Sequence, residues 1–225
     1  MFAVVAAGLA VAGAAVLLPA PTVSSRPVAD PLDRATVRLG SPGLDERLAA
    51  IHELEGLMWG YESPHQPAVM RALSAFVRSR APAGAGCGDA EPAKDVQVAM
   101  DVLGHRATAR DEDTVMDLHG VCLARIVMTY INLAHANLAG ADLTRATFAG
   151  MTLTGVDLTG ARLTSANLTQ AVLVDADLTD ADLAGATLTN ARWSDGTVWP
   201  PRYEPAIDAA SSLDGSLHVI GNLTL

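Results

Sequence analysis

Residues that could bind a metal ion or attack a substrate are scattered along this sequence of 225 residues. The histidines lack the regular spacing that places two ligands on one face of an element; they are His52, His65, His105, His119, His135 and His218. His119 and Cys122 lie three residues apart, but both fall at outward-facing positions of a five-residue repeat and form a weak metal-ligand pair. Neither a glycine-rich phosphate loop nor a serine nucleophile elbow occurs. The sequence therefore predicts no catalytic residue, no cofactor and no metal, and a protein that is not an enzyme.

The two cysteines lie in unlike surroundings. Cys87 is in the glycine-rich stretch 81–92, a predicted loop, and has no cysteine or histidine close to it in sequence. We interpret it as an incidental thiol and not as a redox or metal-binding residue. The pair predicts no disulfide framework, and nothing in the cysteine usage demands an oxidising compartment.

The charge distribution argues against direct binding of nucleic acid. The net charge is −10, and no segment of the chain is basic. Residues 114–198 carry eight acidic residues against four basic ones. Attraction to DNA, RNA or an anionic membrane surface needs the opposite sign of charge. We expect a protein partner, whose identity and stoichiometry the sequence does not reveal.

The first 25 residues predict a hydrophobic transmembrane helix. Phe2 to Leu18 are apolar or glycine, and no charge occurs before Arg26. Extending the segment to Val23 gives a length that crosses a bilayer. Arginines follow the segment and none precedes it, which by the positive-inside rule places the rest of the chain in the bacterial cytoplasm as a single-pass plasma-membrane protein.

A cleaved signal peptide and export are the alternative for this segment. A signal peptide has a basic start and a cleavage site of small residues. This sequence has no lysine or arginine before the apolar run, and Pro19-Ala20-Pro21 is a poor cleavage site.

A small helical domain is predicted over 34–110, after a linker at 26–33. Ser41-Pro42 is typical of a helix start, and five apolar residues then recur on one face, with charged residues including Arg47 on the other. A second helix is expected from about Pro67 and a third from Pro92 to Leu103. Trp59, at a helix end, is interpreted as a core or capping residue.

A repeat of five residues dominates the rest of the chain. Sixteen consecutive units share a large apolar residue at the same position, and ten of them have Ala two residues earlier. The large residues are Leu118, Leu123, Met128, Leu133, Leu138, Leu143, Phe148, Leu153, Leu158, Leu163, Leu168, Leu173, Leu178, Leu183, Leu188 and Trp193. A period of five fits neither an α-helix nor a flat strand. The chain must therefore turn a corner every five residues, with the small and the large residue inside a narrow tube.

Units such as Ala141-Asp142-Leu143-Thr144 and Ala181-Asp182-Leu183-Ala184 resemble the pentapeptide-repeat family. The resemblance covers residues 116–198 and implies a right-handed quadrilateral β-helix, a solenoid with four repeats in each of about four coils. Residues 34–110 and the stretch that begins at Trp193 also resemble, more weakly, membrane-anchored actinobacterial members. The predicted domains are an anchor or signal-like segment at 1–25, a linker at 26–33, a helical domain at 34–110, the β-helix at 111–198, and a cap and tail at 199–225.

Both ends of the predicted β-helix need a cover, because open coil edges are aggregation sites. The first coil has larger inward residues in place of Ala, namely Met116, Val121, Ile126 and Ile131. We expect this coil to be the floor on which the helical domain docks. Trp193, Trp199, Pro200 and Tyr203 are expected to cap the other end, and residues 216–225 are interpreted as a strand that packs back on the domain.

Residues twenty apart stack on one outer face if four repeats make a coil. One face then carries an acidic column, which we define as Asp117, Asn137, Asp157 and Asp177, with Asp180 beside it. The column is a candidate interaction surface. The competing interpretation is that Asp or Asn at this position only hydrogen-bonds the turning backbone.

The function we predict is a non-enzymatic, membrane-tethered scaffold or adaptor that presents rigid β-helix faces to a protein partner. Two alternatives remain. The resemblance suggests a DNA-mimic regulator of a topoisomerase, because quinolone-resistance members of the family resemble B-DNA and protect gyrase. A cleaved N-terminus would instead suggest an exported structural protein of the cell envelope.

Overall fold

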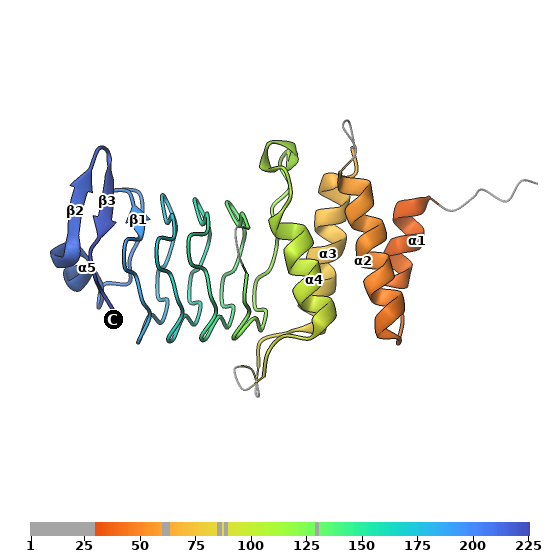
Figure 1. The fold of residues 1–225 in the computed structure, drawn as a ribbon, viewed down its shortest axis with the longest axis horizontal. Coiled ribbons are helices and arrows are strands. Elements are labelled where there is room, and N and C mark those ends of the chain that lie inside the picture. Colours follow the sequence, from red (N-terminus) through yellow and green to blue (C-terminus); the bar gives the residue numbers. More distant parts are fainter. Residues whose placement is uncertain (1–29, 60–63, 85–86, 88–89, 129–130) are drawn as a thin grey trace, which may run out of the picture.

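The molecule is an elongated body with a helical end, a four-sided coil and a small C-terminal sheet (Figure 1). The computed structural model describes residues 30–59, 64–84, 87, 90–128 and 131–225. The predicted transmembrane helix lies outside these residues. Within the part of the chain that is described, no helix is both long and apolar enough to cross a membrane.

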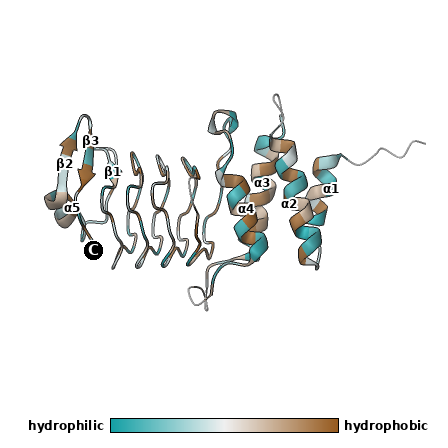
Figure 2. Ribbon diagram, viewed as in Figure 1, coloured by the Kyte–Doolittle hydropathy of each residue, from teal (hydrophilic) through white to brown (hydrophobic). Residues whose placement is uncertain are grey.

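Four α-helices form the helical end. They are α1 (Pro31–Arg38), α2 (Leu44–Met58), α3 (Gln66–Arg80) and α4 (Lys94–Gly104), followed by a 3₁₀ turn, η1 (Thr108–Arg110). The inner faces of α2, α3 and α4 bury most of the apolar residues that the helical periodicity predicted, whereas Leu44 at the start of α2 is exposed. Hydrophobic and hydrophilic stretches alternate along each helix in Figure 2.

Two details of the helical end differ from the sequence prediction. The linker predicted to reach residue 33 already contains helix α1, whose start is capped by the Asp30 side chain, which accepts a hydrogen bond from the Leu32 amide. Helix α2 begins at Leu44 and not at Pro42. The side chain of Arg47 binds the backbone carbonyls of the residues that precede α2, so those residues stay outside the helix.

Residues 116–198 form the predicted solenoid of four coils. Parallel bridges join residues twenty apart in four columns, as in Asn137 to Asp157 and Arg162 to Asp182. Every large residue of the sixteen repeats is buried, as is every small residue two positions before it. The interior of the tube is therefore filled by two apolar residues from each repeat, as the period of five predicts.

A turn closes each five-residue side. From Ala136 to Ala191, the amide of each small inward residue donates to the carbonyl of the preceding large residue, as in Ala141 N to Leu138 O at 3.0 Å. The second turn residue has a positive φ of 55–71° in the described turns from Gly120 to Asn190. Six of these positions are glycine, which adopts this conformation without steric strain.

The helical end covers the first coil on all four sides. Arg78 binds the Asp117 carbonyl, and Gln97 binds the Val127 carbonyl. On the third side the Asn132 amide donates to Gly104 O at 2.8 Å, and Arg106 donates to the carbonyls of Asn132 and Ala134. The residues 81–83 cover the fourth side. The expected docking floor is confirmed, and it is closed by hydrogen bonds as well as by apolar packing.

The C-terminal residues cover the other end. Helix α5 (Glu204–Ala210) leads into β2 (Ser211–Asp214) and β3 (Leu217–Ile220), and β3 lies between β2 and β1 (Arg192–Trp193). The residues after β3 then run along the last coil, where the Leu188 amide donates to Leu223 O and the Leu225 amide to Ala186 O. Trp193 and Trp199 are buried edge to face. The expected cap and returning strand are confirmed.

Gly104 fixes how closely the helical end approaches the first coil. A Cβ at this position would lie 2.4 Å from the Cβ of Ile131. We expect Gly104→Ala to lower the free energy of unfolding by about 1–3 kcal/mol, because the two buried backbones must move apart. Urea unfolding followed by circular dichroism measures this change.

The matched control is Gly56→Ala in α2, where an added Cβ meets nothing within 4 Å. This control should raise stability by roughly 0.5–1 kcal/mol, because Ala favours the helix interior. Equal effects of the two substitutions would contradict the proposed contact at Gly104.

Candidate functional site

The acidic column exists as predicted on one side of the coil. Successive parallel bridges join Asp117 to Asn137, Asn137 to Asp157 and Asp157 to Asp177. The Asn137 amide group donates to Asp117 Oδ1 at 3.2 Å. Asp180 lies on the turn that follows Asp177, and its side chain is exposed.

The side chains of the column support the backbone turns. In Asn137, Asp157 and Asp177 one side-chain oxygen accepts a hydrogen bond from the amide two residues later, at 2.9–3.0 Å. The same bond occurs at other sides of the coil, for example at Asn132 and Asn167. Because neutral Asn makes the same bond as charged Asp, this geometry requires an acceptor oxygen and not a negative charge.

Asp117 has a second role at the start of the column. Its carboxylate pairs with Arg78 of α3 and accepts from His119 Nδ1 at 2.7 Å. Burial raises the pKa of Asp117, but the hydrogen bonds from His119 and the charge of Arg78 outweigh it, so the pKa is lowered. The first member of the column therefore joins the helical end to the coil.

The adjacent face carries a groove of about 530 Å³ that the sequence analysis did not identify. Its floor includes Asp142, Arg162 and Asp182, which lie twenty residues apart. Arg162 pairs with the buried Asp142 at 2.8 Å, and Arg202 pairs with Asp182 at 2.9 Å. The feature of the sequence that could have indicated the groove is the pair Gly140 and Gly160, because these residues leave the same corner of successive coils without side chains.

The electrostatics of this groove stabilise its carboxylates in the charged form. Burial raises the pKa of Asp142, but hydrogen bonds from Thr144 and the guanidinium of Arg162 lower it below its ordinary range. The pKa of Asp182 is lowered in the same way by bonds from Ala184, Tyr203 and Thr164 and by the charge of Arg202. These acids are paired within the fold and are not poised for proton transfer at neutral pH.

The interpretation of the cysteines was wrong. Cys87 and Cys122 form a disulfide, with Cα atoms 5.7 Å apart. The bond joins the loop after α3 to the first coil across 35 residues of sequence. A closed loop of this length stabilises a fold by roughly 3–4 kcal/mol in the chain-entropy model. Residues far apart in sequence and unlike in their surroundings meet here because the helical end folds back on the coil.

The pair of His119 and Cys122 is not arranged as a metal site. Cys122 is bonded to Cys87, and His119 contacts Asp117. Among the residues described by the structure, no group of three or more His, Cys, Asp or Glu side chains is placed to hold a metal ion.

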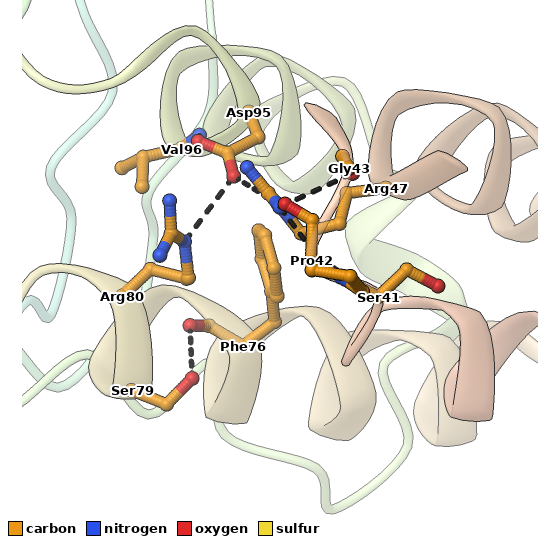
Figure 3. A network of polar contacts seen from close by, with 9 residues as sticks. All are labelled: Ser41, Pro42, Gly43, Arg47, Phe76, Ser79, Arg80, Asp95 and Val96. Carbon is orange, nitrogen blue, oxygen red and sulfur yellow. Dashed lines mark hydrogen bonds and ion pairs between the residues drawn. The ribbon is translucent and has the colours of Figure 1, made fainter. Parts of the chain in front are cut away.

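A buried charge network lies inside the helical end (Figure 3). The fully buried Asp95 of α4 accepts from Arg47 Nε at 2.6 Å and from Arg80 Nε at 3.2 Å. Arg47 was expected on the polar face of its helix, but it is buried and also binds the carbonyls of Ser41, Pro42 and Gly43. The network ties α2, α3 and α4 together.

Residues 122–160 and 157–192 match the family model of pentapeptide repeats, in eight copies. This part of the chain is a pentapeptide-repeat domain, whose expected fold is the right-handed β-helix. None of the curated proteins matches the chain.

Several solved structures are similar to part of this chain. A pentapeptide repeat protein of the cyanobacterium Cyanothece 51142 is 31% identical over 38% of this chain and 60% of its own, with a TM-score of 0.35. One from Nostoc Pcc 7120 is 36% identical over 37% and 61%, with a TM-score of 0.24. One from the thylakoid lumen of Arabidopsis thaliana is 28% identical over 44% and 77%, with a TM-score of 0.21. The chain thus spans less than two thirds of the two cyanobacterial proteins.

We expect Asp157→Ala and Asp157→Asn to differ in stability. Ala loses the acceptor for the Thr159 amide and should lower the free energy of unfolding by about 1 kcal/mol. Asn keeps this bond, as Asn137 does in the same column, and should change stability by less than about 0.5 kcal/mol. Thermal and urea unfolding of both variants test this, and an equal loss in both would show that the charge itself is required.

The Asp95 network predicts a pH dependence. Burial raises the pKa of Asp95, but the hydrogen bond from Arg47 and the charges of Arg80 and Arg47 lower it below its ordinary value of 3.8. A lowered pKa gives stability that is present above the unfolded value, about 4, and is lost as pH falls through the folded pKa. At pH 7 we expect Asp95→Asn to cost about 3–5 kcal/mol, because it leaves buried arginine charge uncompensated.

Urea unfolding of wild type and Asp95→Asn from pH 7 to pH 2.5 checks this result. The difference between them should shrink as pH falls below about 4, where Asp95 of the unfolded chain gains a proton before Asp95 of the folded protein does. The control Asp208→Asn, on an exposed helix face, should follow wild type throughout. A pH-independent difference would contradict the assignment.

Proposed function

We propose that this protein is a non-enzymatic scaffold that holds a protein partner against the faces of its β-helix. The observation that carries the proposal is the closure of the coil at both ends, by the helical end and by the C-terminal residues. With both edges covered, the surfaces left for recognition are the four sides. Pentapeptide repeats support an interaction scaffold of this kind.

The faces are rigid and differ in chemistry. The acidic column and the groove at Asp142, Arg162 and Asp182 lie on adjacent sides of the coil. Their backbone is held by coil-to-coil hydrogen bonds of 2.7–3.0 Å. A preformed surface binds a partner with little loss of conformational entropy. These properties suit an adaptor better than a surface that must fold on binding.

Attachment to the bacterial plasma membrane is part of the proposal, through residues 1–25. The apolar composition of Phe2–Leu18 supports a single span, and the arginines that follow it support a cytoplasmic body. No contact with nucleic acid is proposed.

Affinity capture of tagged full-length protein from detergent-solubilised native membranes tests the scaffold. The informative variant is the double substitution Asp157→Asn and Asp177→Asn, because it removes two charges from the acidic column and keeps both turn hydrogen bonds. If the column docks the partner, we expect one dominant protein in the wild-type sample and at least about a tenfold loss in the variant.

The matched control is Asp45→Asn with Asp208→Asn, which removes the same charge at exposed positions on helices α2 and α5, away from the column. Equal capture by wild type and both variants would exclude the column as a docking surface and direct attention to the groove. Turnover of any substrate by purified residues 27–225 would contradict the scaffold itself.

Export to the cell envelope is a second candidate that one observation favours. The Cys87–Cys122 bond is of a kind that persists in oxidising compartments and is rare in the cytosol. A mature N-terminus near Thr22 would support export, whereas an intact Met1 in the membrane fraction would support the tether.

Regulation of a topoisomerase has less support, because the side chains of the acidic column already bind the backbone of the turns. Inhibition of gyrase supercoiling at micromolar protein would reverse this ordering.

A further inference from the structure

The residues after α3 lie against one edge of the first coil as a short strap, which we define as residues 81–84 together with Cys87. Pro82 bridges Val121 in antiparallel register. The Ala83 amide donates to Gly120 O, and the Cys122 amide donates to Ala81 O, both at 2.7 Å. Two backbone hydrogen bonds therefore join the strap to the coil in the described part of the chain.

The disulfide closes this short pairing. Cys122, whose amide binds the strap, is also the residue bonded to Cys87. Both cysteines are partly exposed, so a small thiol can reach the bond. Exposed disulfides are the ones that undergo exchange most readily.

The other sides of the first coil are closed without a covalent bond. They use the side chains of Arg78, Gln97 and Arg106 and the carbonyl of Gly104. Two of these groups, Gly104 and Arg106, are buried and are held by the helical core. The strap has less support, since three of its residues, Pro82, Ala83 and Gly84, are exposed and only Ala81 packs against the core.

The strap also shapes the groove on the coil. Ala83 and Gly84 line it opposite Asp142, Arg162 and Asp182. A change in the position of the strap would remove one wall of this groove. It would also uncover the backbone carbonyl of Gly120 and the amide of Cys122 at the coil edge.

We propose that the Cys87–Cys122 bond is a redox-sensitive clasp that sets whether this edge and groove are closed. In the oxidised protein the strap is held on the coil. A dithiol opens the clasp when one of its thiolates attacks a cysteine sulfur and forms a mixed disulfide, which its second thiolate resolves. Two protons and two electrons pass to the cysteines, and the dithiol leaves as its cyclic disulfide. When the strap is released from the coil, the rest of the β-helix keeps its structure.

Amide hydrogen exchange on the full-length protein in detergent micelles tests the clasp, with dithiothreitol as the dithiol. The reporters are the amides of Ala83 and Cys122, whose hydrogen bonds protect them from exchange only while the strap lies on the coil. The reference is the Leu163 amide, bonded to Asp182 O within the coil. On reduction we expect exchange at both reporters to rise by about tenfold or more, with the reference changed by less than about twofold.

Cys87→Ser provides the matched control. Without reductant this variant should reproduce the exchange of the reduced wild type, and dithiothreitol should then have no further effect on it. Unchanged reporters in reduced wild type would show that hydrogen bonds alone hold the strap and would overturn the proposal. Faster exchange at Leu163 as well would overturn it too, because the bond would then hold the whole coil. Two free thiols after incubation with oxidised glutathione would show that the clasp does not form.

Discussion

The structure depends on closing the two edges of a narrow coil. Each side of a coil has only one short stretch of extended backbone, and its amides and carbonyls bond to the coils before and after it. This pairing is complete in the middle of the coil and missing at its ends, where an unpaired buried group costs about 1–3 kcal/mol. The helical end and the C-terminal sheet both exist where these groups must be satisfied.

The helical end meets this requirement because it is itself held in one arrangement. Asp95 joins Arg47 and Arg80, so that three helices share one buried ion network. The close approach of Gly104 to Ile131 then brings a helix carbonyl to the coil edge. Flexible helices could not place hydrogen-bond partners on all four sides at once. The buried charges therefore have a structural role, although charged clusters in other proteins often mark active sites.

The outward polar residues show how a repeat can resemble a binding surface. Asp and Asn recur before the large inward residue because the turn that follows needs an acceptor oxygen. A column of negative charge results wherever Asp is used on one side in several coils. Charge on such a face is available to a partner, but its regularity has a local cause. The groove beside it is different, because it requires residues of the coil and of the strap together.

The sequence by itself determined the features that depend on local repetition. A period of five with alternating small and large apolar residues allows only a coil that turns every five residues, so the buried positions followed from it. The four repeats in each coil, and hence the number of coils, followed from the resemblance to the pentapeptide-repeat family. The oversized Met116, Val121, Ile126 and Ile131 marked the docking floor because they fill all four small positions of one coil, whereas the later coils have Ala at most of these positions. The acidic column followed from the spacing of twenty.

Only the tertiary structure decided the features that join distant residues. Helix α1 is short and lies in a Pro- and Asp-rich stretch, and packing against α2 stabilises it. Arg47 has the sequence position of a solvent-facing residue, and its burial depends on Asp95, 48 residues away. The disulfide had no local signature, because Cys87 and Cys122 belong to different parts of the fold. Pairing of this kind depends on how the helical end sits on the first coil, and periodicity carries no information about that placement.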